Sequence, residues 1–121
     1  MAKTVLAIDD SSSMRQLVGF ALKDAGYEVI SAIHGKDALE KADGKKVDVV
    51  VTDLNMPEMD GIEFIKQFKS KAGCRFTPVI MLTTESQAAK QQAGKAAGAA
   101  GWLVKPFKPE ELLDLIKRFV R

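Results

Sequence analysis

The chain has 121 residues, of which 46% are hydrophobic and 28% charged. This balance predicts one soluble globular domain over residues 1–121, with no separate effector module, and argues against a disordered or fibrous chain. The single cysteine, Cys74, and the single histidine, His34, exclude an intramolecular disulfide, a multi-cysteine zinc site and a His-rich metal site. We therefore expect a reducing, cytoplasmic setting, and no apolar stretch approaches the ~20 residues that a membrane helix needs.

The net charge of +2 is divided unevenly along the chain. Residues 1–60 carry a net charge of −4 and residues 61–121 a net charge of +6. The acidic first part suits a cation site. The basic residues of the second part are scattered along helical patterns instead of forming a stripe, so we expect no nucleic-acid binding.

Short apolar runs alternate with helical periodicities and predict five strand–helix units. The predicted strands are residues 4–8, 28–31, 47–52, 78–82 and 102–104, and the helical patterns that follow them cover 14–25, 38–42, 62–68, 86–97 and 112–120. Ser11, Ser12 and Ser13 precede the first helix, where N-capping is a better interpretation than nucleophilic catalysis. Asp60 is the predicted N-cap of the third helix.

This alternation predicts an α/β fold, a doubly wound five-stranded parallel sheet between two layers of helices. In such sheets ligands bind beyond the carboxyl ends of the strands. The residues at those predicted ends are Asp9 and Asp10, then Asp53, Thr83 and Lys105. All the chemically capable strand ends therefore meet at one edge of the sheet.

Three carboxylates in one site repel each other unless a cation lies among them. Oxygen ligands without nitrogen or sulfur favour Mg²⁺, which commonly shares its coordination shell with phosphate oxygens. Lys105 adds a compact positive charge, and Thr83 a hydroxyl that could bind the product. An aspartate carboxylate can attack phosphorus to form an aspartyl phosphate, so the pattern indicates phosphoryl transfer.

A specific set of residues resembles the receiver domain of two-component response regulators, of the stand-alone CheY type with its flavodoxin-like (βα)5 fold. The set is Asp9-Asp10, Asp53 with Asn55-Met56-Pro57, Asp60-Gly61, Thr83, and Lys105-Pro106-Phe107, and the resemblance covers essentially the whole chain. It implies that Asp53 accepts a phosphoryl group from a histidine kinase. It also implies that Asp10, Asp53 and the Asn55 carbonyl hold Mg²⁺, that Asp9 helps through water, and that Lys105 pairs with the acceptor.

The resemblance further implies a switch. Thr83 moves toward the phosphoryl group, the aromatic side chain of Trp102 turns inward, and the peptide bond before Pro106 is cis. Asn55 and Glu85, two positions after the acceptor and after Thr83, flank the attacking water and tune the lifetime of the phosphate.

The fourth predicted helix is the softest element of the chain. Gly94 lies inside it, and its apolar face is made of small side chains: Ala88, Ala89, Ala93, Ala96 and Ala97. Such a helix buries little apolar area and carries a glycine that costs ~1 kcal/mol relative to alanine. We therefore expect this helix, the Trp102 strand and the last helix to form the output face, as the resemblance also implies.

The implied partners are a CheA-like histidine kinase as donor, a flagellar motor switch protein as target, and a phosphatase; a monomer is expected. Trp102 departs from the usual Tyr or Phe, which weakens the motor assignment and leaves a phosphorelay intermediate or phosphate sink as the alternative. A phosphohydrolase resembling the haloacid dehalogenases would need an aspartate at position 55, which is Asn. A phosphorylation-independent binding module is a further alternative, and the intact acidic residues argue against it.

Overall fold

The computed structural model describes residues 3–54, 56, 59–71, 73–84, 88–105 and 107–120, with the backbone alone at 84 and 88–91. Its five parallel strands form one sheet in the order β2-β1-β3-β4-β5. The strands are β1 (Thr4–Ile8), β2 (Glu28–Ala32), β3 (Val49–Asp53), β4 (Val79–Thr84) and β5 (Gly101–Lys105). The helices are α1 (Ser12–Asp24), α2 (Gly35–Ala42), α3 (Gly61–Lys69), α4 (Ala88–Ala97) and α5 (Pro109–Phe119).

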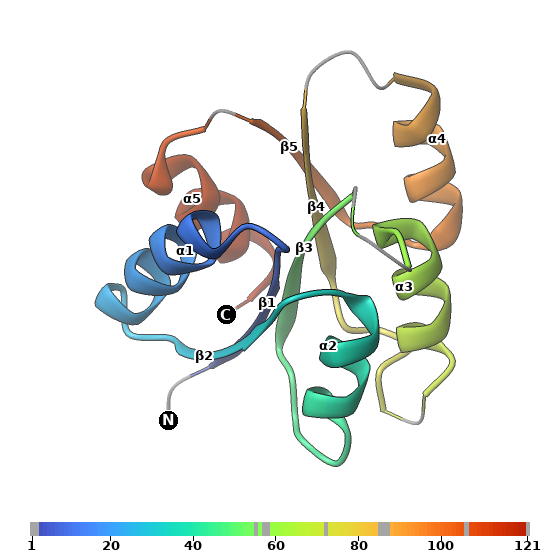
Figure 1. Ribbon diagram of the computed structural model, residues 1–121, viewed down its shortest axis with the longest axis horizontal. Helices are drawn as coiled ribbons and strands as arrows, with labels where there is room; N and C mark the ends of the chain where they lie inside the picture. Colours follow the sequence, from blue (N-terminus) through green and yellow to red (C-terminus); the bar gives the residue numbers. More distant parts are fainter. Residues whose placement is uncertain are drawn as a thin grey trace.

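Helices cover both faces of the sheet, with α1 and α5 on one face and α2, α3 and α4 on the other (Figure 1). Successive strand residues point to opposite faces, so each strand contributes to both cores. In β1, Val5 packs with α1 and α5, whereas Leu6 packs with α2 and α3. The predicted three-layer doubly wound fold is confirmed.

In α1, α2 and α3, the side chain of the residue before the helix caps its first turn. The hydroxyl of Ser11 accepts from the amide of Met14, and the carboxylate of Asp60 accepts from the amide of Glu63 at 2.8 Å. Both caps were predicted. The third is His34, whose Nδ1 accepts from the amide of Asp37 at 3.1 Å.

Several element boundaries differ from the sequence prediction. The cap by His34 starts α2 at Gly35, three residues earlier than the apolar pattern indicated. β3 begins at Val49 instead of residue 47, because the carboxylate of Asp48 turns back to accept from the amide of Thr4 at 2.8 Å. Apolar periodicity reports the packed centre of an element, whereas caps and turns set its ends.

The predicted alanine face of α4 is partly wrong. Ala93 and Ala96 are exposed, and Ala97 is partly buried. Gly94 is the buried residue among positions 92–97, because the side chain facing it is the indole of Trp102. The side chains of residues 88 and 89, and the predicted helix start at residue 86, lie outside the described part of the chain.

Candidate functional site

The sheet places two buried aspartates side by side. β1 and β3 pair in parallel with Ile8 opposite Thr52, so Asp9, which follows β1, lies beside Asp53, the last residue of β3. Both carboxylates are mostly buried. Two carboxylates this close at the carboxyl edge of the sheet require positive charge nearby.

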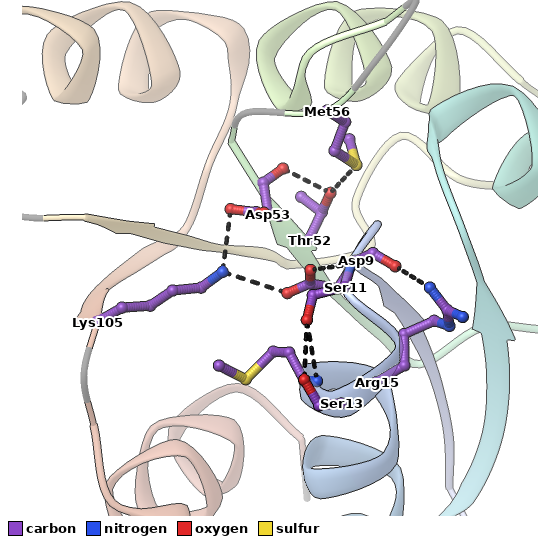
Figure 2. A network of polar contacts seen from close by, with 9 residues as sticks. Asp9, Ser11, Ser13, Arg15, Thr52, Asp53, Met56 and Lys105 are labelled. Atoms are coloured by element: carbon purple, nitrogen blue, oxygen red, sulfur yellow. Dashed lines mark hydrogen bonds and ion pairs between the residues drawn. The ribbon is translucent and has the colours of Figure 1, made fainter.

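Lys105 supplies that charge (Figure 2). Its Nζ lies 3.2 Å from Oδ2 of Asp9 and 3.3 Å from Oδ1 of Asp53. The lysine ends β5 and reaches toward β1 and β3, and its side chain is only 18% exposed. A partly buried cation held between two carboxylates forms the core of the site.

Asp10 adds a third carboxylate on the solvent side. Carboxylate oxygens of Asp9, Asp10 and Asp53 all lie within 4.8 Å of one another, and Asp10 is exposed. Three oxygen ligands on one open side suit a hard cation such as Mg²⁺, which keeps several waters. The donor set therefore fits the magnesium ion that the sequence predicted.

Asp53 has an unusual electrostatic environment. Burial raises the pKa of its carboxyl group above the ordinary value, and the negative charges of Asp9 and Asp10 raise the pKa further. The ammonium of Lys105 opposes this and lowers the pKa. The carboxylate of Asp53 is thus poorly solvated and crowded by like charge, and a cation entering the site would relieve both effects.

Backbone contacts that the sequence prediction missed hold Asp9 in place. The amide of Ser11 donates to Oδ1 of Asp9 at 2.9 Å, and Nη1 of Arg15 donates to its carbonyl oxygen at 2.8 Å. Because Oδ1 is already engaged, Oδ2 is the oxygen that faces Lys105 (Figure 2). Helical spacing from Ser11 could have placed Arg15 on the same side of α1 as Ser11. Nothing in the sequence, however, shows that the guanidinium of Arg15 turns back to β1.

The end of β3 is fixed in a similar way. The hydroxyl of Thr52 donates to the carbonyl oxygen of Asp53 at 3.0 Å and lies 3.8 Å from Sδ of Met56. Gly61, the first residue of α3, packs so tightly here that a Cβ would lie 2.7 Å from the Asp53 carbonyl oxygen. Only glycine allows α3 to start this close to the acceptor candidate.

Thr83 is the other predicted site residue that the structure brings to this edge. It is buried in β4 and pairs with Val104, one residue before Lys105. Asn55, Glu85 and Pro106, for which ligand, lifetime and cis-peptide roles were predicted, lie outside the described residues.

Trp102 lies three residues before Lys105 on β5 and is partly buried. Its indole packs against α4 at Gly94 and joins the hydrophobic cluster of α2 and α3. His34 acts as a helix cap, and Cys74 is a partly buried free thiol.

Fold and site together define a flavodoxin-like domain with an acidic, lysine-containing site at the carboxyl edge of its sheet. The profile of the response regulator receiver domain matches residues 5–117. The chemotaxis protein CheY1 of Helicobacter pylori is 39% identical over 115 residues, which cover 93% of each chain. The solved structure of the Vibrio cholerae chemotaxis protein CheY4 superimposes with a TM-score of 0.95 at 51% identity, covering 99% of this chain and 100% of that one.

A longer relative gives the same assignment. The alkaline phosphatase synthesis transcriptional regulatory protein PhoP of Bacillus subtilis is 36% identical over all of this chain, which spans 50% of its length. The chain therefore belongs to the response regulator receiver domain family of two-component signalling and is of the CheY type. No helix in the described part of the chain is long and apolar enough to cross a membrane.

Proposed function

We propose that this protein is a phosphorylation-controlled signalling switch in which Asp53 accepts a phosphoryl group from a histidine kinase. The observation that carries the proposal is the position of the Lys105 ammonium between Asp9 and Asp53, with Asp10 open to solvent beside them. This arrangement offers a nucleophile, a charge to neutralise the phosphoryl oxygens and an open approach for the donor.

In the proposed transfer, a carboxylate oxygen of Asp53 attacks the phosphorus of a phosphohistidine. The new P–O bond forms as the P–N bond to the donor imidazole breaks, and the imidazole leaves with the bonding electron pair and takes up a proton. With acetyl phosphate as donor, the bond to the acetyl oxygen breaks and acetate leaves. Burial of Asp53 keeps its nucleophilic carboxylate poorly solvated. The ammonium of Lys105 can stabilise the negative charge of this carboxylate before transfer and that of the phosphoryl oxygens during it.

The metal ligands in this proposal are Asp10, Asp53 and the backbone carbonyl of Asn55, with Asp9 acting through water. A bound Mg²⁺ would neutralise charge on the phosphoryl oxygens and orient the group for in-line displacement. Asp9 is restrained by Ser11 and Arg15, so it can keep its position whether or not the cation is bound.

The signal is read on the surface formed by α4, β5 and α5, which we name the output face. The phosphoryl group adds about −1.5 to −2 charge and three acceptor oxygens at the end of β3. Thr83 offers a hydroxyl in the next strand to such a group, and Trp102 lies on the neighbouring strand against α4. Asn55 and Glu85 are the residues we expect to tune hydrolysis of the phosphate.

The names of the relatives suggest the pathway. Both CheY1 and CheY4 are chemotaxis proteins, so we propose a CheA-like kinase as phosphodonor and a protein of the flagellar motor switch as target. In this proposal the receiver domain acts in the cytoplasm.

The proposal is tested by intact-mass spectrometry after incubation with acetyl phosphate and Mg²⁺. We expect one phosphoryl adduct in the wild type, and none in Asp53→Asn or in wild type treated with EDTA. Asp24→Asn, which alters an exposed carboxylate at the end of α1, is the matched control and should form the adduct normally.

Two outcomes would contradict the proposal. An adduct that persists in Asp53→Asn would place the acceptor elsewhere. A wild type that forms no adduct, yet binds its target, would favour a binding module that works without phosphorylation.

A further inference from the structure

Gly94 lies inside α4 and faces the indole of Trp102. A Cβ added at Gly94 would lie 2.7 Å from Cζ3 of Trp102 and 3.6 Å from Cε3 and Cη2 of the same ring. Real Cβ atoms essentially never come within 3.0 Å of another side-chain atom, so alanine at this position requires the ring to move. The indole therefore occupies the space where a side chain of α4 would be.

Backbone conformation does not explain this glycine. Gly94 is not among the glycines with positive φ, which are Gly26, Gly44, Gly73 and Gly98. Inside a helix, glycine is less favourable than alanine because it loses more conformational freedom. Gly19 also lies inside a helix, α1, but a Cβ added there would have no neighbouring atom within 4 Å, so packing gives no reason for that glycine.

The direction of the indole follows from β5. Side chains alternate along the strand, and the space beside Gly101 is filled from α5 by Phe119 and Leu115. Trp102 therefore points to the opposite face, toward α4, where it packs against the cluster that contains Phe64 and Phe68. The indole bridges β5 and α4, two of the three elements of the output face.

We propose that Gly94 is a positioning residue for Trp102, so that the missing side chain on α4 and the large side chain on β5 form a matched pair. The pair holds the indole against α4 and thereby sets the shape of the output face. Calling the surface an output face rests on the proposed function, whereas the pairing itself does not. A shift of α4 relative to β5 would move the indole, so the position of Trp102 and that of α4 are coupled.

The test uses Gly94→Ala in the unphosphorylated full chain, with Gly19→Ala as the matched control. Trp102 is the only tryptophan, so fluorescence reports its position directly. In Gly94→Ala we expect emission at longer wavelength and stronger quenching by acrylamide, because the indole is displaced into solvent. In Gly19→Ala both signals should stay unchanged, while Tm rises by roughly 3 °C from the gain in helix propensity.

A second measurement keeps the proposal testable if Gly94→Ala folds poorly. Phenylalanine lacks the outer ring of indole, so in a Trp102→Phe background Gly94→Ala should be tolerated and Tm should stay level or rise. The double-mutant cycle then gives a non-zero interaction between the two positions. Equal effects of Gly94→Ala in both backgrounds, or wild-type emission and quenching in Gly94→Ala, would overturn the proposal.

The phosphoryl adduct of the same variants separates this inference from the proposed function. Because Gly94 does not touch the carboxylates, Gly94→Ala should form the adduct with acetyl phosphate and Mg²⁺ to the same extent as the wild type. If neither protein forms it, the proposed function fails and the fluorescence result still decides the pairing. Loss of the adduct in Gly94→Ala alone would show that position 94 acts on the site itself and would contradict a role confined to Trp102.

Discussion

The helices α3 and α4 lie side by side on the same face of the sheet, yet they are anchored very differently (Figure 1). α3 begins with a capped turn and buries Phe64, Ile65 and Phe68 completely. In α4, among residues 92–97, the buried position is a glycine, and its partner is a side chain from β5. α3, which begins beside Asp53, is thus tightly packed on the sheet, whereas α4, which contacts Trp102, is weakly packed in its described part.

This difference suits a switch. Free energy from a new charge at the end of β3 can shift an element only if that element costs little to move. α3 starts against the Asp53 carbonyl through Gly61, which helps to fix the position of Asp53. α4 buries little apolar area in its described part, so we expect it to respond first.

The largest predicted effect concerns the anchor of α3. Phe68→Ala removes a fully buried ring that stacks on Phe64 with centroids 5.4 Å apart, and it should lower the free energy of unfolding by about 3–5 kcal/mol. Ala97→Gly in α4 should cost only about 1 kcal/mol. Urea denaturation of both variants measures the contrast, and equal losses would refute the difference in anchoring.

The second prediction uses Mg²⁺ to separate the two helices. At 100 times its Kd, the ion should stabilise the fold by about 2.7 kcal/mol, because it binds the native carboxylates and not the unfolded chain. Hydrogen exchange should then slow for amides of α3, which open with the whole domain, and change little in α4, which opens locally. Asp53→Asn, which lacks one of the three carboxylates, should lose most of the effect. Equal slowing in both helices would show that α4 opens only with the whole domain.

The sequence predicted much of this architecture because strands and the polar residues that follow them leave simple patterns. The apolar runs that end at Asp9, Asp53 and Lys105 were enough to predict that these residues lie together, since parallel strands align their carboxyl ends. The capped starts at Ser11 and Asp60 were also readable, because each cap lies within one helical turn of its partner.

What the sequence did not predict depends on three-dimensional packing between distant segments. Gly94 appeared only as a weak point of a helix, because nothing near it in the chain indicates the indole eight residues later. The hydrogen bond from Arg15 to the carbonyl oxygen of Asp9 depends on the orientation of the arginine side chain. The packed face of α4 depends on the direction in which the Trp102 side chain leaves β5. These features have no periodicity to detect.

The third prediction tests the start of α3. Asp60→Ala removes the acceptor for the amide of Glu63 and should cost about 1 kcal/mol of stability. Asp60→Ser keeps a capping oxygen and should retain most of that stability, which urea denaturation would show. If Asp60→Ser were as unstable as Asp60→Ala, the cap would not be what fixes this end of α3.

The smallest predicted effect concerns Lys69, the last residue of α3, which packs against Gly98, the residue after α4. Nζ of Lys69 donates to the carbonyl oxygens of Arg75 and Thr77, and its aliphatic chain packs on Gly98. Burial lowers the pKa of this ammonium below its ordinary value of 10.5, an effect that the nearby Cys74 partly offsets. Folding therefore disfavours the charged form of the lysine.

The sign of the pH dependence follows from this shift. Between the lowered native pKa and the ordinary value, the unfolded chain binds more protons than the native protein, so stability rises with pH in this window. Urea denaturation at increasing pH up to 10.5 should show that the free energy of unfolding of the wild type rises relative to that of Lys69→Gln. The comparison is made in a Cys74→Ser background, so that ionisation of the thiol does not contribute. A difference between the two proteins that stays constant with pH would mean that Lys69 is as well solvated as in the unfolded chain, and that α3 and α4 meet through a looser contact than the packing on Gly98 implies.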